Sequence, residues 1–133
     1  MQEVIEFLTA NPMGVLATVD GGRPRVRPWG FMFAEGTRLW FCTANTKDVF
    51  RQLRNNPAVE FCSTSKDMVT VRVSGEVRFS QDREIKKAII ARNDLVRSIY
   101  KTADNPVFEI FCLEHGKAAR SDFSGQPPRV VEF

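Results

Sequence analysis

The sequence predicts a mainly β protein of the α+β class, in which an antiparallel β-barrel carries helices between its hairpins. Short apolar runs, many rich in β-branched or aromatic residues, recur along the chain and are separated by turn residues. Only two or three segments have the apolar spacing of a helix, and they fall between hairpins instead of alternating with single strands. No repeat or linker divides residues 1–133, which we expect to form a single domain.

The first third of the chain is predicted to hold a short helix and three strands in meander order. Apolar residues at helical spacing indicate the helix, and the pair Asn11-Pro12 ends it. Asp20-Gly21-Gly22 is typical of a tight hairpin turn, and Glu35-Gly36-Thr37 makes a second turn. In order, the helix and the three strands are expected at residues 3–9, 13–19, 23–34 and 38–43.

The middle third is predicted to contain one helix and two strands. Thr46 is a plausible N-cap for a helix that runs to Asn55, with Asp48 in its first turn. Strict alternation of apolar residues indicates that the second strand is long, and Gly75 near its middle predicts a bulge. The helix and the strands are expected at residues 46–55, 58–63 and 68–79.

The last third is predicted to open with a second substantial helix, capped by Ser80, that continues to Tyr100 after a break at Asn93-Asp94. A strand follows, and Glu114-His115-Gly116-Lys117 is interpreted as a turn in which the single histidine is exposed to solvent. The three closing strands are expected at residues 107–113, 118–122 and 128–133.

Composition narrows the class of protein. Hydrophobic residues make up 43% of the chain and charged residues 26%, as in ordinary globular proteins. No apolar stretch approaches the ~20 residues of a membrane span, and the first residues carry acids, so we expect a cytoplasmic protein without a membrane segment. No C-x-x-C pair occurs, so no metal site is predicted, and three thiols are expected to be buried as small apolar groups: Cys42, Cys62 and Cys112.

A net charge of +3 raises the question of an anionic ligand. Arg25 and Arg27 are two residues apart on one predicted strand and therefore face the same side. Thr43 ends the next strand, and Thr46-Lys47 opens the following helix, whose first N–H groups suit a phosphate. The residues are compatible with an anion pocket, and also with an arginine-faced outer strand followed by an ordinarily capped surface helix.

Several stretches in a fixed order carry a family resemblance that covers nearly the whole chain. They are Gly22–Phe31 (GRPRVRPWGF), Leu39–Lys47 (LWFCTANTK), Gln52-Leu53, Asn56–Val59 (NPAV), Val73–Val77 (VSGEV), Asp82–Glu84 (DRE) and Asn105–Phe108 (NPVF). Together they resemble the small bacterial members of the pyridoxamine 5′-phosphate oxidase-like flavoproteins. The resemblance implies a split β-barrel that forms a homodimer, with FMN held in a cleft between the subunits.

The resemblance also implies which residues hold the cofactor. Arg27 would contact it from the second strand, the loop before the helix would hold the phosphate, and the Gln52 side chain would approach the ring system. The implied FMN-binding residues are Arg27, Pro28, Trp29, Cys42, Thr43, Asn45, Thr46, Lys47 and Gln52. The family's loop often carries two adjacent basic residues, whereas Asp48 follows Lys47 here, so phosphate binding is expected to depend more on Arg27 and backbone amides.

The resemblance implies an FMN-dependent oxidoreductase that transfers hydride or electrons from a nicotinamide or another donor to a small acceptor. The final segment has no histidine, so vitamin B6 oxidation itself is not expected. The alternatives are a flavin-binding redox sensor, carrier or stress protein without turnover, or a barrel that holds haem or a deazaflavin instead. No catalytic acid or base is assigned, and no RNP1-like run or zinc-finger spacing points to nucleic acid.

Five aromatic residues on the predicted strands could stack on a flavin, although most aromatic residues on facing strands belong to a core. They are Trp29, Phe31, Phe33, Trp40 and Phe41, with Trp29 the favoured one.

Overall fold

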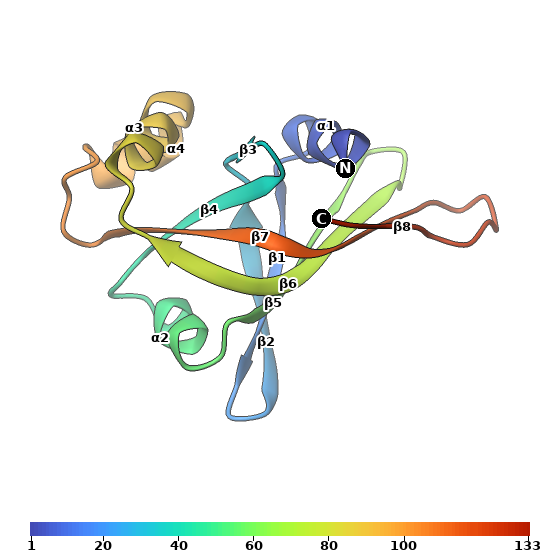
Figure 1. The fold of residues 1–133 in the computed structure, drawn as a ribbon, viewed down its shortest axis with the longest axis horizontal. Coiled ribbons are helices and arrows are strands. Elements are labelled where there is room, and N and C mark those ends of the chain that lie inside the picture. Colours follow the sequence, from blue (N-terminus) through green and yellow to red (C-terminus); the bar gives the residue numbers. More distant parts are fainter.

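A computed structural model describes all 133 residues, and four helices and eight strands follow one another much as predicted (Figure 1). The helices are α1 (Gln2–Ala10), α2 (Asp48–Asn55), α3 (Arg83–Arg92) and α4 (Asp94–Tyr100). The strands are β1 (Met13–Asp20), β2 (Arg23–Gly30), β3 (Phe33–Glu35), β4 (Arg38–Ala44), β5 (Ala58–Thr64), β6 (Thr70–Ser80), β7 (Phe108–Ser121) and β8 (Arg129–Glu132). None of the helices is long and apolar enough to cross a membrane.

All the strands belong to one antiparallel sheet, in the order β2-β1-β5-β6-β7-β4-β3, with β8 paired to β7. The two ends of this path, β2 and β3, are consecutive in the chain and are joined through Phe31 and Met32. The Phe31 N–H donates to the Pro12 carbonyl at 2.8 Å, and the Met32 N–H donates to the Trp40 carbonyl at 3.0 Å. The sheet therefore curls back on itself, and the predicted α+β fold with an antiparallel split barrel is confirmed.

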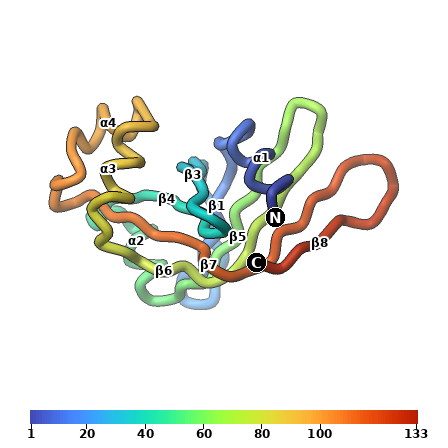
Figure 2. The backbone as a smooth tube through the Cα atoms, turned by 45° about the horizontal axis from the view of Figure 1, so that its top comes forward, coloured from blue at the N-terminus to red at the C-terminus, as the bar shows by residue number.

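The α3–α4 pair, helix α2 and the β7–β8 hairpin lie in separate regions around the barrel (Figures 1 and 2). The hairpin of β7 and β8 extends beyond the barrel body, and the α3–α4 pair lies at the other end of the molecule. The α2 helix packs against β1 and β4, next to the hairpin of β1 and β2.

Strand β4 separates two hydrophobic clusters, because alternate side chains of a strand point to opposite faces. Leu39 and Phe41 lie in the barrel core, where the Phe41 ring stacks on Phe111 with centroids 5.6 Å apart. Trp40 and Cys42 point the other way, into a second cluster that the α3–α4 pair covers. Burial on both faces explains why β4 reads as a nearly continuous apolar run.

A bulge marks the middle of the β6–β7 ladder. Gly75 pairs with Gly116, whereas Val77 pairs with Leu113, so two residues of β7 lie opposite one residue of β6. The bulge predicted at Gly75 is confirmed, but the extra residue belongs to β7. The predicted turn at residues 114–117 is wrong: β7 runs through it, and its turn-like residues accommodate the bulge instead.

Other predicted elements shift for identifiable reasons. Residues 23–34 form two strands instead of one, because the chain leaves β1 after Gly30 and joins β4 at Phe33. The α3 helix is capped by Asp82 and not by Ser80: the Asp82 carboxylate accepts from the Glu84 N–H at 2.9 Å.

Gly116 is expected to be essential for the bulge. A Cβ at this position would lie 2.2 Å from the Ser74 carbonyl oxygen, so β6 and β7 would have to separate. We expect Gly116→Ala to lower the free energy of unfolding by about 2–3 kcal/mol, measured by urea denaturation. The control is Gly36→Asn at an exposed turn, where φ is +60° and no atom lies within 4 Å of the added Cβ. The free energy of unfolding of this variant should stay within about 1 kcal/mol of the parent value. Equal losses of stability in the two variants would contradict the role of Gly116 in the bulge.

Candidate functional site

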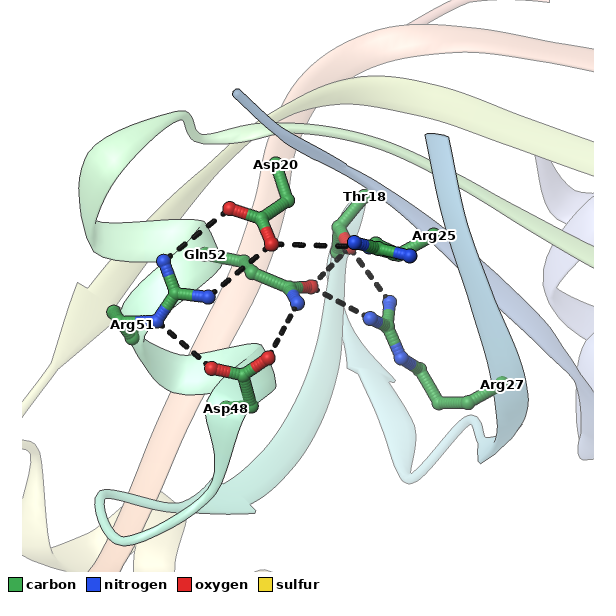
Figure 3. A network of polar contacts seen from close by, with 7 residues as sticks. All are labelled: Thr18, Asp20, Arg25, Arg27, Asp48, Arg51 and Gln52. Carbon is green, nitrogen blue, oxygen red and sulfur yellow. Dashed lines mark hydrogen bonds and ion pairs between the residues drawn. The ribbon is translucent and has the colours of Figure 1, made fainter. Parts of the chain in front are cut away.

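The Arg27 guanidinium is held by hydrogen bonds to neutral groups (Figure 3). Its Nη1 donates to the Thr18 hydroxyl at 2.7 Å and to the Leu16 carbonyl at 3.2 Å, and its Nη2 donates to Gln52 Oε1 at 2.6 Å. The Thr18 hydroxyl donates in turn to the same Gln52 oxygen at 2.6 Å. Strands β1 and β2 and helix α2 thus meet at one polar triangle.

The triangle continues into a chain of charged groups at the start of α2 (Figure 3). Gln52 Nε2 donates to the Asp48 carboxylate at 2.9 Å, and Arg51 bridges Asp48 to Asp20. The bonds from Arg51 hold the pKa values of both carboxyl groups below their usual range. Arg25 approaches Asp20 at 3.7 Å, so Arg25 and Arg27 do face the same side of β2, as predicted.

Arg27 differs from these neighbours because it forms no direct ion pair. Burial lowers the pKa of its guanidinium, and the more distant Asp48 carboxylate only partly opposes that effect. A guanidinium remains protonated at any physiological pH. Its positive charge is therefore partly withdrawn from water and is not neutralised by an adjacent carboxylate.

The N-terminus of α2 lies one helical turn before Gln52, the α2 residue that contacts Arg27. The predicted N-cap at Thr46 is wrong: Lys47 is the N-cap residue, and no side chain caps the first turn. The Thr46 side chain is exposed and makes no hydrogen bond. The first N–H groups of a helix have no partners within the helix, so this end keeps its capacity to bind an anion.

An apolar cleft with a volume of about 230 Å³ opens next to the same helix end. Strands β1, β2 and β4 form one wall, and helix α4 forms the other. The lining residues are Met13, Pro28, Trp29, Gly30, Met32, Cys42, Lys47, Asn93, Leu95, Val96, Ile99 and Tyr100. Four of the residues that the sequence assigns to cofactor binding, Pro28, Trp29, Cys42 and Lys47, are thus brought together on one surface.

The cleft contains neither a carboxylate nor a histidine. Lys47 Nζ lies 5.5 Å from the centroid of the Trp29 ring, at the boundary between the apolar wall and the helix end. Burial raises the pKa of the Cys42 thiol to about 12, and its S–H points toward Met32 Sδ at 3.7 Å. Cys42 is therefore a neutral packing group at physiological pH and not a nucleophile.

The other assigned residues occupy different environments. The Thr43 hydroxyl is buried and has no hydrogen-bond partner within the chain. Asn45 turns away from the arginine, and its side-chain amide donates to the Pro106 carbonyl at 2.9 Å and to Glu109 at 3.1 Å. Asn45 thus positions the loop before β7, and its amide protons are not available to a ligand in this arrangement.

Among the aromatic candidates, only Trp29 lines the cleft. Phe31 and Phe41 are buried in the barrel core, and Trp40 lies in the second cluster. The exposed His115 lies on β7 and is no part of the cleft.

Sequence reasoning missed Thr18 and the α4 wall of the cleft. Thr18 lies at a buried position of β1, and the residues around it in the sequence do not indicate that its side chain makes polar contacts instead of packing in the core. Its register partner offered the available signal, because Thr18 pairs with Arg25 across the predicted hairpin and so lies beside both strand arginines. The available signal for the α4 wall was the pair Leu95 and Ile99, apolar residues on the predicted helix. In the structure they are not buried against α3 and are 66% and 56% exposed.

Comparison with known proteins places this arrangement in a family. A sequence search of curated proteins finds no match. Among solved structures, a NimC/NimA family protein from Clostridium acetobutylicum is 29% identical, with a TM-score of 0.90 over 100% of this chain and 92% of that chain. General Stress Protein 26 from Bacillus anthracis is 19% identical, with a TM-score of 0.81 over 99% of this chain and 98% of that chain.

A third structure shares the fold: a pyridoxamine 5′-phosphate oxidase-related, FMN-binding protein from Nostoc punctiforme. It is 18% identical, with a TM-score of 0.74 over 98% of this chain and 84% of that chain. The model of the family described as pyridoxamine 5′-phosphate oxidase matches residues 1–118, which include the barrel closure, the Arg27 triangle, the α2 N-terminus and the apolar cleft. This chain therefore belongs to the pyridoxamine 5′-phosphate oxidase family.

Proposed function

We propose that the chain binds FMN and acts as an FMN-dependent oxidoreductase on a small acceptor. The observation that carries the proposal is the adjacency of three features. Arg27 holds a charge without an ion pair, α2 begins without a side-chain cap one turn before its contact with Arg27, and an apolar cleft lined by Trp29 and Lys47 opens at this helix end. A phosphate fits the first two features and a flat ring system fits the third.

The residues present fit FMN at the buried Thr43 as well. Its hydroxyl is the kind of orphaned polar atom that a bound group can satisfy; Thr43 points to the face of β4 opposite the cleft residue Cys42, and it precedes the turn that leads to α2. When bound, FMN supplies hydride and electron transfer. The chain's own residues would orient it: Trp29 and Pro28 flank the ring, and Arg27, Lys47 and the α2 amides hold the phosphate.

The cleft of one chain is small for this ligand. Its volume of about 230 Å³ is below the roughly 300–1,000 Å³ typical of small-molecule pockets. We propose that a second copy of the chain completes it. Adjacent to the cleft, the outer face of β1 and β2 is apolar, because Val15 pairs with Pro28 and Ala17 pairs with Val26.

The exposed apolar surface continues across the mouth of the cleft. Met13 is 63% exposed, Val26 on β2 is 66% exposed, and Leu95 on the opposite wall is 66% exposed. Contiguous exposed apolar area of this kind marks interaction surfaces in soluble proteins. A homodimer built on this surface would cover the cleft from outside and exclude water from it.

The first test is an absorption spectrum of the purified protein before and after incubation with FMN and desalting. Retained bands of oxidised flavin support the proposal. A colourless protein that cannot be loaded overturns it, and a Soret band or a deazaflavin spectrum assigns the cleft to another occupant.

Arg27→Ala should weaken FMN binding by about 1.5–3 kcal/mol, because charge-assisted hydrogen bonds to the phosphate are lost. Isothermal titration calorimetry measures the dissociation constant. Arg54→Ala is the control, since Arg54 is exposed on α2, where it packs over Phe50. Unchanged affinity in Arg27→Ala would remove Arg27 from the phosphate site.

Turnover separates an enzyme from a flavin carrier. Sustained oxidation of NADH or NADPH by the FMN-loaded protein, with a quinone or a nitro compound as acceptor, is expected for the oxidoreductase. Bound flavin without sustained turnover with any of these pairs would favour the sensor or carrier.

The dimer is tested by analytical ultracentrifugation. Val26→Asp places a charge in the centre of the apolar face and should shift the parent dimer toward monomer. Met68→Asp is the control, because Met68 is 52% exposed at a turn with a φ of +62°, away from this face. A monomeric parent protein, or a dimer that survives Val26→Asp, would contradict the proposed interface.

A further inference from the structure

The hydrogen bonds of Arg27 leave one particular edge of its guanidinium free. The group has five N–H donors: one on Nε, two on Nη1 and two on Nη2. Both Nη1 donors are used, by Leu16 and Thr18, and one Nη2 donor is used by Gln52. The remaining two are the Nε–H and one Nη2–H, which lie parallel on the same edge of the planar group and match two oxygens of a phosphate.

Thr18 is the residue that can fix this orientation. Its side chain is 2% exposed, and its hydroxyl has a single consistent role, since it accepts from Arg27 and donates to Gln52. Gln52 is fixed as well, because its Nε2 must donate to Asp48, which leaves Oε1 for Arg27 and Thr18. Neither residue can rotate without breaking a buried hydrogen bond.

The same triangle keeps the charge of Arg27 available. Arg25 and Arg51 are both engaged by Asp20, whereas the partners of Arg27 are a hydroxyl, an amide and a main-chain carbonyl. Asp48 forms no hydrogen bond or ion pair with Arg27, because the Gln52 amide bonds to both and lies between them. A carboxylate at position 18 or 52 would neutralise the arginine, whereas these neutral groups hold it without doing so.

We propose that Thr18 is a positioning residue, which together with Gln52 presents the Nε–Nη2 edge of Arg27 for a bidentate contact with the phosphate of FMN. The inference rests on the proposed function, and it adds that phosphate recognition depends on a residue that does not touch the ligand. Thr18 acts only through Arg27 and therefore affects the phosphate end of the ligand and not the ring.

The test compares FMN with riboflavin, which carries the same ring system without the phosphate. Thr18→Val keeps the shape of the side chain and removes the hydroxyl. We expect the dissociation constant for FMN to rise about tenfold, which is near the smallest effect expected when a hydrogen bond to a charged group is lost. The dissociation constant for riboflavin should change by less than about twofold. Thr18→Ser restores the hydroxyl and should return the FMN value to within about threefold of the parent.

Two further variants separate positioning from general damage. Ser63→Ala removes another buried hydroxyl, which donates to the Asn11 carbonyl at 2.6 Å. This variant should leave the ratio of the riboflavin dissociation constant to the FMN dissociation constant unchanged. Arg27→Lys keeps the charge but loses the planar fork, so it should lower FMN affinity at least as much as Thr18→Val. Thermal unfolding of every variant reports on the fold separately.

The outcomes are distinct. Equal losses for FMN and riboflavin in Thr18→Val, no loss for either, or full FMN affinity in Arg27→Lys each overturn the positioning role while leaving FMN binding intact. If Thr18→Val does not fold, the role is tested by two other variants. Thr18→Ser should keep the parental FMN affinity, and Gln52→Glu, which adds a carboxylate beside Arg27, should lower the ratio of the riboflavin dissociation constant to the FMN dissociation constant. An unchanged ratio in Gln52→Glu overturns the role. A parent protein that binds neither ligand overturns the proposed function and this inference with it.

Discussion

Pairing along β7 is the constraint on which the rest of the structure depends. This strand has 14 residues and pairs with β6 over nearly its whole length, while its first half also pairs with β4 and its second half with β8. The bulge at Gly116 divides the halves. Bulges increase the local bend and twist of a strand, so β7 can belong to the closed barrel on one side and to the projecting hairpin on the other.

Closure of the barrel then determines where the functional groups meet. Because β2 and β3 belong to opposite ends of the sheet, the short connection between them brings β2 next to β4. The outer side of β4 contributes Cys42 to the cleft, and its C-terminal end leads into α2. The polar triangle and the apolar cleft are thus adjacent as a direct result of the strand order, without any long functional loop.

Local chemistry made most of the fold predictable. Turn residues and apolar periodicity located six of the eight strands and the helices to within a few residues, because these signals act over short distances. The errors arose where tertiary pairing decides. Residues 114–117 have turn chemistry but are held extended by β6 on one side and by Phe133 on the other, since the Gly116 N–H donates to the Phe133 carbonyl at 2.9 Å. The division of residues 23–34 depends on which strand Met32 bonds to, which local sequence does not encode.

The candidate site was predictable in part for the same reason. Arg27, Lys47 and Trp29 stand in stretches with a family resemblance, and the structure brings them to neighbouring positions. The burial of Thr18 against α2 requires contact between residues 34 apart, and the α4 wall requires the packing of α3 and α4 on the outer face of the sheet. Neither contact has a signature within a window of local sequence.

The unpaired charge of Arg27 affects the stability of the folded protein. Withdrawing a cation from water without a counterion costs stability, and an anion on the free edge recovers it. Under the proposed function, the folded population is therefore linked by mass action to the concentration of the ligand. Without flavin, a larger fraction of the chains would therefore be unfolded at equilibrium.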